Sequence, residues 1–240
     1  MASHAPATLE VDAPHGHGHH DHGHDHPPHL QHHFVSSEQQ FDAAKLGMWL
    51  FLMTEILLFS GMFVAYTVYR VWHPEVFEAA ALVLDTTMGF INTLVLLASS
   101  GTMAMAINRI QHDDRKGCTL FLALTLIGAL VFLVIKYFEY TTKFHGGVYP
   151  GAAFNPHGEH YGYLADVPYA KQFFSIYFMA TGIHAFHIIV GIGVLTWVLI
   201  RNIRGQFSSG WYTPVELGGL YWHLVDIIWI FLFPLLYLIR

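Results

Sequence analysis

The sequence has few charged residues, few cysteines and no basic cluster. Only 12% of its 240 residues are charged, whereas 54% are hydrophobic. Soluble domains carry about 25% charged residues, so this composition argues against an ordinary soluble domain. The formal net charge of −6 argues against a nucleic acid as partner. The one cysteine, Cys118, excludes an internal disulfide and a CxxC metal site.

What the sequence does contain is long apolar runs. Windows of about 20 apolar residues predict five membrane-spanning helices, at about residues 45–70, 84–108, 118–140, 172–200 and 214–239. Each is long enough to cross about 30 Å of hydrocarbon at about 1.5 Å per residue. We therefore expect an all-α fold, in which a polytopic membrane protein forms a bundle of five transmembrane helices.

The first 40 residues differ in composition from the rest. Residues 1–33 hold eleven of the 19 histidines, separated by Gly, Asp and Pro. This pattern predicts a disordered His-rich tail over residues 1–40 and a transmembrane domain over residues 41–240. Such a tail binds Zn, Cu or Ni loosely, and specific metal delivery is the alternative reading. The tail has no apolar core like that of a secretory signal, so we expect the first membrane helix to direct insertion.

The connections between the predicted helices are short, with one exception. Residues 143–171 form a connection of 29 residues that is rich in Gly, Tyr and Pro. Long structureless loops are uncommon in compact domains. We therefore expect this segment to cover a partner.

The positive charges indicate orientation only weakly. If the N-terminus lies inside, six Lys and Arg residues fall on the inner side and five on the outer side. The inner set is Lys45, Arg109, Arg115, Lys116, Arg201 and Arg204, and the outer set is Arg70, Lys136, Lys143, Lys171 and Arg240. Because cytoplasmic loops carry more Lys and Arg, the count slightly favours an inner N-terminus.

One carboxylate lies deep in the first predicted helix. Glu55 is about ten residues from the helix start, and no Lys, Arg or His of its own helix is within two turns. Ionisable residues inside a membrane are costly and mark functional sites. Two readings remain open: a neutral acid that donates a hydrogen bond across a helix interface, or a group that exchanges protons or faces lipid.

The last two predicted helices carry a second set of polar residues. His184 and His187 share one helix face, and His223 and Asp226 are spaced so that they can satisfy each other. Glu216 either completes a capping box with Thr213 or extends the stripe of His223 and Asp226. A metal site built from His184, His187, His223 and Asp226 is the alternative to hydrogen bonding between helices.

Three stretches together resemble one protein family. The runs "GMWLFLMTEILLFSGMF", "ATGIHAFHIIVGIG" and "VELGGLYWHLVDIIWIFLFPLLY" occur in this order. They are similar to motifs of subunit III of the haem–copper respiratory oxidases, in the short form with five helices. The resemblance covers about residues 43–240, and it places Glu55 at the position of that family's carbodiimide-reactive glutamate.

The resemblance implies an accessory subunit of a proton-pumping cytochrome c oxidase, in the cytoplasmic membrane of a bacterium. Such a subunit has no redox centre or catalytic residue of its own, and it supports proton uptake and stability of the catalytic subunit. Haem and copper reside in partner subunits, and the partners are catalytic subunit I, subunit II, other oxidase subunits and phospholipids.

The family topology implies an N-terminus in the cytoplasm and a C-terminus in the periplasm. In this reading Glu55, His184, His187, Glu216, His223 and Asp226 form a proton-linked or interhelical polar network, with no metal bound. Arg201 binds a lipid head group, or alternatively only extends its charged end to the interface. The alternatives are subunit III of a quinol oxidase, a metal-ion transporter with a His-rich buffer tail, and a membrane metalloenzyme.

Overall fold

A computed structural model describes residue 34 and residues 36–238. It contains five long helices: α1 (Ser37–Trp72), α3 (Thr86–Gln111), α4 (Arg115–His145), α5 (Ala170–Ile203) and α6 (Thr213–Tyr237). All five are long and apolar enough to cross a membrane, which confirms the predicted all-α membrane fold. The predicted disordered tail lies largely outside the described residues, and residues 37–40 of that range already belong to α1.

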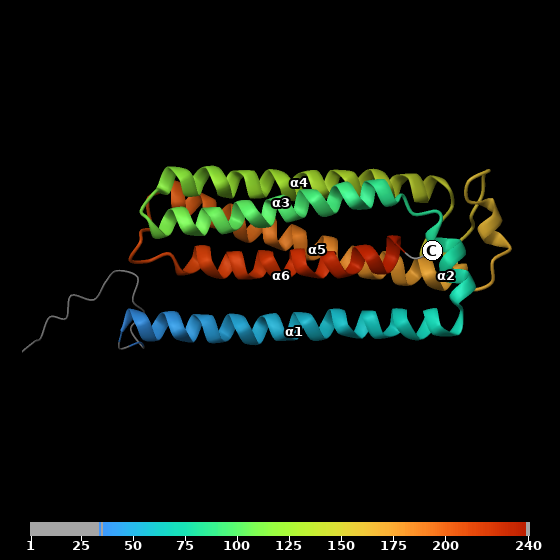
Figure 1. Cartoon of the computed structure of the whole chain (residues 1–240), viewed down its shortest axis with the longest axis horizontal. Coiled ribbons are helices and arrows are strands. Elements are labelled where there is room, and N and C mark those ends of the chain that lie inside the picture. The colour runs from blue at the N-terminus through green and yellow to red at the C-terminus, as the bar shows by residue number, and fades with distance from the viewer. Residues whose placement is uncertain (1–33, 35, 239–240) are drawn as a thin grey trace, which may run out of the picture. The chain divides into compact units, whose positions relative to one another are not determined.

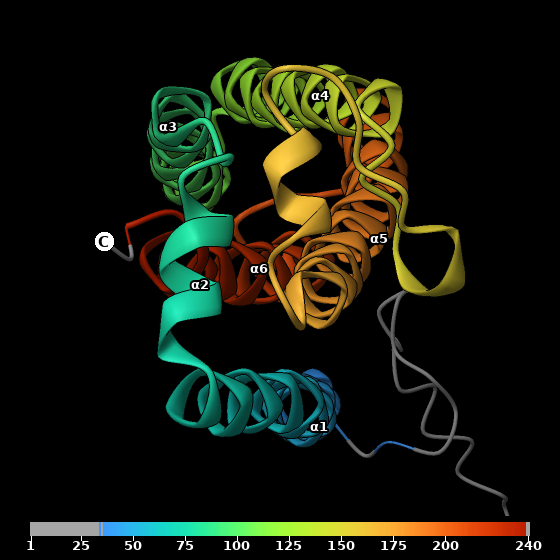
Figure 2. The ribbon, with the colours of Figure 1, turned by 90° about the vertical axis from the view of Figure 1, so that its right-hand side faces the viewer.

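Helices α3, α4, α5 and α6 pack around a common core within residues 41–240. Neighbouring helices run antiparallel, with α3 beside α4 and α6, and with α5 beside α4 and α6 (Figure 1). Viewed along the helices, these four surround the core (Figure 2). Three large aromatic side chains of α6, Trp222, Trp229 and Tyr237, are fully buried there.

The ends of α3 and α4 are fixed by aspartates. Asp85 accepts hydrogen bonds from the backbone N–H groups of Thr87 and Met88 at 2.9 and 3.1 Å, which caps α3. Asp114 accepts from Gly117 N–H at 2.9 Å and caps α4 in the same way. Such caps satisfy backbone donors that the first helical turn leaves unpaired. The turn between α3 and α4 has only three residues, 112–114.

Asp113 connects this turn to the α5–α6 connection. Its backbone has φ of +58°, in the left-handed region that side chains such as Asp tolerate. Its carboxylate accepts hydrogen bonds from Ser209 N–H at 2.7 Å and from the Ser209 hydroxyl at 2.6 Å. Hydrogen bonding by the Ser209 hydroxyl, followed by that of its N–H, lowers the pKa of Asp113 below its ordinary value. The hydrogen bonds between Asp113 and Ser209 thus join the α3–α4 and α5–α6 connections at this end of the bundle.

Helix α1 has far less of its surface buried. Only 11% of its most apolar window is buried, compared with 56% for α6. Its buried residues, Leu52, Phe59 and Tyr66, are spaced by seven and therefore follow one stripe of the helix. The Tyr66 hydroxyl donates a hydrogen bond to the carbonyl oxygen of Leu235 in α6. Figure 2 shows α1 set apart from the ring of α3 to α6.

Three short elements were not predicted from the sequence: α2 (Pro74–Ala81), η1 (Gly151–Ala153) and η2 (Gly162–Ala165). Helix α2 and the 143–171 connection lie across one end of the bundle (Figure 2). The Phe77 and Phe173 rings are 5.1 Å apart, and the Tyr163 hydroxyl donates to the Ala79 carbonyl at 3.0 Å. Partial burial raises the pKa of Tyr163. Much of this connection packs on its own chain; whether it also covers a partner stays a prediction.

Candidate functional site

The structure brings Glu55 of α1 together with His187 of α5. Glu55 Oε2 and His187 Nε2 are 2.7 Å apart, and both side chains are largely buried. The other ring nitrogen, Nδ1, lies 2.8 Å from the Ile183 carbonyl oxygen. The Phe59 ring meets the imidazole edge to face at 5.3 Å. Sequence reasoning could not pair Glu55, because its partner is 132 residues away.

These contacts restrict where the protons of the pair reside. A carbonyl oxygen only accepts, so His187 Nδ1 must carry a hydrogen and donate it to Ile183. Nε2 then either accepts a proton from a neutral Glu55 or donates one to a Glu55 carboxylate. Both arrangements are electrically neutral as a pair. The site can therefore shift one proton between the carboxyl group and the imidazole without placing net charge in the membrane.

His223 and Asp226 do not satisfy each other, contrary to the expected pairing. His223 Nδ1 lies 2.7 Å from the Ser100 hydroxyl of α3. Neither oxygen of Asp226 has a hydrogen-bond partner of normal geometry in the described part of the chain, although Ser100 lies close enough to interact with it. Positions three apart on a helix differ by about 60° in direction. The two side chains can thus face different surroundings.

His184 and Glu216 also lie outside any shared network. The His184 ring is fully buried, and it stacks on Trp229 at 5.2 Å with no hydrogen bond to a described residue. Glu216 forms an ion pair with Lys45 of α1 at 2.8 Å. The capping box predicted for Glu216 is wrong, because α6 begins at Thr213 itself and the preceding Tyr212 makes no side-chain cap.

Arg201 lies near the end of α5, as the sequence indicated. Its Nε donates to Gln206 Oε1 at 2.6 Å, and its guanidinium carbon is 4.6 Å from the centre of the Trp197 ring. A guanidinium has five N–H donors, so these contacts leave others for a ligand. Its role in lipid binding stays a prediction.

The histidines and carboxylates do not assemble into a metal site among the described residues. No group of three or more His, Cys, Asp or Glu side chains there is placed to hold a metal ion. His187 faces Glu55, whereas His223 faces Ser100. The geometry therefore gives no support to the alternative with four metal ligands.

An apolar groove of about 520 Å³ lies between α1 and α6. Phe59 and Ile56 of α1 face Leu224 and Ile228 of α6 across it, and His223 lies in its wall. The groove follows from the small contact area of α1.

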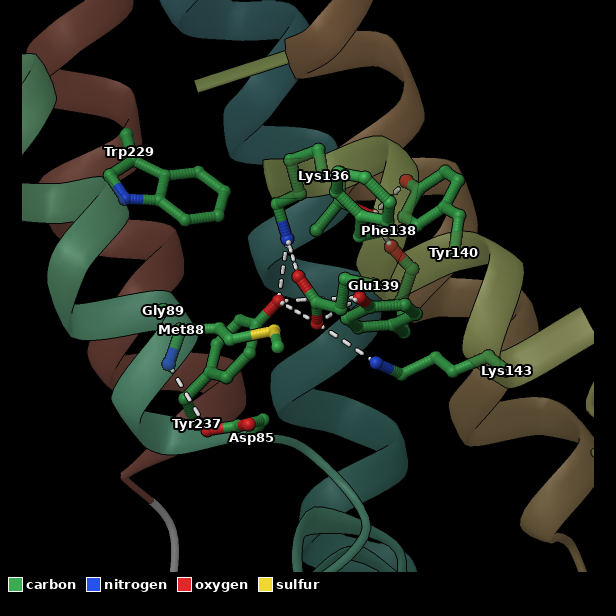
Figure 3. Close-up of polar contacts among 12 residues, drawn as sticks. Asp85, Met88, Gly89, Lys136, Phe138, Glu139, Tyr140, Lys143, Trp229 and Tyr237 are labelled. Atoms are coloured by element: carbon green, nitrogen blue, oxygen red, sulfur yellow. Dashed lines mark hydrogen bonds and ion pairs between the residues drawn. The ribbon is translucent and has the colours of Figure 1, made fainter. Parts of the chain in front are cut away.

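The structure also contains a buried charged cluster that sequence reasoning missed. Lys136 and Lys143 of α4 donate to the two oxygens of Glu139 at 2.8 and 2.9 Å, and all three side chains are buried (Figure 3). Tyr177 of α5 and Tyr237 of α6 donate to Glu139 Oε1 at 2.7 and 2.6 Å. Lys136 also donates to the Tyr237 hydroxyl at 2.6 Å. One carboxylate thus joins three helices.

A signal for this cluster was present in the sequence. Lys136, Glu139 and Lys143 are spaced by three and four residues, so they lie on one face of α4. Because Lys136 and Lys143 lie near the end of the span predicted at residues 118–140, they were counted among the positive charges of the outer side.

Fold and site together define a polytopic α-helical membrane protein in which Glu55 of one long apolar helix pairs with His187 of another. The sequence profile of the family described as Cytochrome c oxidase subunit III matches residues 30–239. The chain belongs to this family, the subunit III family of the haem–copper oxidases.

Individual relatives agree with this family. Cytochrome c oxidase subunit 3 of Thermostichus vulcanus is 32% identical over 203 residues, covering 82% of this chain and 88% of the relative. The same subunit of Synechocystis is 30% identical, covering 82% and 76%. Haem–copper oxidase subunit I+III of Aeropyrum pernix is 28% identical over 82% of this chain, but over only 23% of its own length.

Proposed function

We propose that the chain is the non-catalytic subunit III of a proton-pumping cytochrome c oxidase, and that it sustains proton uptake into the catalytic subunit and protects it from inactivation. The observation that carries the proton-linked part is the Glu55–His187 pair. It is buried, it joins two helices, and it can hold one proton in two electrically neutral arrangements. Such intramembrane ionisable residues are costly and mark proton pathways in membrane proteins.

In this proposal the haems and copper reside in partner subunits. Subunit I is the main partner, together with subunit II and other oxidase subunits. The Aeropyrum pernix relative supports subunit I as the main partner, because its name joins subunit I and subunit III in one chain. The names of the Thermostichus and Synechocystis relatives favour cytochrome c over quinol as electron donor.

The proposed location is a bacterial cytoplasmic membrane, with the N-terminus in the cytoplasm and the C-terminus in the periplasm. Lys136 and Lys143, which the sequence assigned to the outer side, are buried against Glu139 and do not act as loop charges. The exposed basic residues Arg109, Arg115, Lys116 and Arg204 lie at the opposite ends of the helices. This distribution supports an inner N-terminus more strongly than the residue count did.

The test uses the purified native oxidase complex with Glu55→Gln in this chain. Glutamine keeps the shape of the side chain but cannot exchange the proton. We expect a near-normal initial rate of oxygen consumption and clearly faster loss of activity during turnover. Asp42→Asn, at an exposed position of the same helix, is the matched control and should behave as wild type.

Two results would contradict the proposal. The first is a purified complex whose absorption spectrum shows no haem and whose subunits include no catalytic subunit. The second is a Glu55→Gln complex that loses activity no faster than the Asp42→Asn complex.

A further inference from the structure

An open groove of about 470 Å³ runs along the surface of α4, at the end of the bundle that holds the charged cluster. One part of its lining is apolar, with Leu133 and Phe144 of α4 and Ala185 of α5. The other part is polar, with Thr141, His145 and Tyr149. This α4 groove is separate from the α1–α6 groove, and it lies far along the helices from Arg201.

The groove has the length of one membrane leaflet. Leu133 and His145 are twelve residues apart on α4, which corresponds to about 18 Å. One leaflet accounts for about half of the roughly 30 Å of hydrocarbon in a bilayer. His145 is the last residue of α4, whose 31 residues exceed the about 20 that cross the hydrocarbon, so the polar end of the groove lies toward the membrane surface. The groove therefore runs from the bilayer interior to the interface.

The charges beside the groove favour an anion. The cluster beneath it contains two lysines and one glutamate, so its formal charge is +1. The Lys136 ammonium lies 6.0 Å from the centre of the Tyr140 ring, and Tyr140 lines the groove. Buried charges are screened much less than exposed ones, so this excess charge acts across the ring. His145 is exposed at the polar end and can donate a hydrogen bond.

A tyrosine adds a hydroxyl group at the polar end. Tyr149 is 39% exposed and lines the groove together with His145, whereas Tyr137, 68% exposed, lies about 12 Å nearer the bilayer interior along α4. The Tyr149 ring is held by stacking on Phe144, with ring centres 5.1 Å apart and planes only 5° apart. Tyrosines with an apolar ring and a free hydroxyl are typical of the head-group level of a membrane.

We propose that the α4 groove binds one anionic phospholipid. Its acyl chain lies against Leu133 and Ala185, and its phosphate lies at the end formed by His145 and Tyr149. The buried cluster beneath supplies the excess positive charge that prefers an anionic over a zwitterionic head group.

The test is native mass spectrometry of the full chain, purified in mild detergent and supplied with an equal mixture of phosphatidylglycerol and phosphatidylcholine. We expect one retained phospholipid per chain, with about a fivefold preference for phosphatidylglycerol. That factor corresponds to about 1 kcal/mol for one basic residue near an anionic lipid. Ala185→Phe fills the apolar part of the groove and should abolish the retained lipid. The matched control is Ala104→Phe, at an exposed alanine of α3, which should retain it.

Two further arms identify the binding chemistry. Inorganic phosphate in excess should not displace the lipid; displacement would show that the groove selects a free anion. A photoactivatable phosphatidylglycerol should label residues 133–149 in the unaltered chain, so the proposal can be tested even if Ala185→Phe fails to fold. No retained lipid, no preference between the two lipids, retention in Ala185→Phe, or labelling confined to other segments would each overturn the proposal.

Discussion

Helices α6 and α1 are both apolar and both long enough to cross a membrane, yet they are held in different ways. Helix α6 places Trp222, Trp229 and Tyr237 in the core between α3, α4 and α5. Helix α1 buries one narrow stripe, and polar contacts at Lys45, Glu55 and Tyr66 connect it to the other helices. In a bilayer, apolar surface gains little by leaving lipid, so close packing and hydrogen bonds hold helices together. The packed helix α6 thus belongs to the core, whereas α1 depends on a few specific polar contacts.

Matched tryptophan substitutions test this comparison most directly. Trp229→Ala removes a buried ring that contacts Phe132, His184 and Lys136. We expect it to lower the free energy of unfolding by about 3–5 kcal/mol. Trp49 of α1 lies beside the α1–α6 groove and is 57% exposed, so Trp49→Ala should change the free energy of unfolding by no more than about 0.5 kcal/mol. Denaturant titration of the full chain in detergent, followed by circular dichroism, measures both. Equal effects would show that α1 is packed as tightly as α6.

Glu139→Gln tests whether charge pairing with Lys136 and Lys143 stabilises the core beside α6. It leaves Lys136 and Lys143 buried without their carboxylate, which should lower the free energy of unfolding by about 3–5 kcal/mol. Glu78→Gln, at an exposed position of α2, is the control in the same titration. If both substitutions have the same small effect, the cluster does not stabilise the bundle.

A double-mutant cycle tests whether the Glu55–His187 pair holds α1 against α5. Glu55→Gln and His187→Asn, made singly and together, should give a coupling energy of about 1.5–3 kcal/mol, since the hydrogen bond involves groups that can be charged. The same cycle between Glu55→Gln and His223→Asn should give a coupling energy near zero, because His223 bonds to Ser100. Comparable coupling in the two cycles would contradict the specific pairing of α1 with α5.

The smallest expected effect concerns the hydrogen bonds between Asp113 and Ser209, which join the α3–α4 and α5–α6 connections. The pKa of Asp113 is lowered in the folded chain, so its stabilisation is present above the ordinary aspartate pKa and is lost as pH falls through the lowered value. Backbone hydrogen exchange at Ser209 should therefore show less protection in acid than near neutral pH, after correction for the intrinsic exchange rate. Asp113→Asn should remove that pH dependence. A protection factor that does not vary with pH in the unaltered chain would exclude this role.

The sequence predicted the five long helices because a bilayer requires every backbone group of a spanning segment to be bonded within it, and apolar length then marks the span. Helix α2 was missed because eight residues with a mixed composition resemble a loop. The candidate residues Glu55 and His187 were identified as unusual, but their pairing was not. That pairing depends on how α1 is rotated and positioned against α5, which spacing along one helix does not define. The expected His223–Asp226 pair failed because positions three apart on a helix differ by about 60° in direction, and His223 faces Ser100 of α3 instead.

The charged cluster also bears on how the chain is made. Lys136, Glu139 and Lys143 belong to one helix, so their ion pairs require only that α4 be helical. During synthesis α4 emerges before α5 and α6, which later supply Tyr177 and Tyr237. The carboxylate can therefore offset lysine charge while the segment enters the membrane, before its tyrosine partners exist. Because its ion pairs lie within one helix, α4 can form them before α5 and α6 are synthesised.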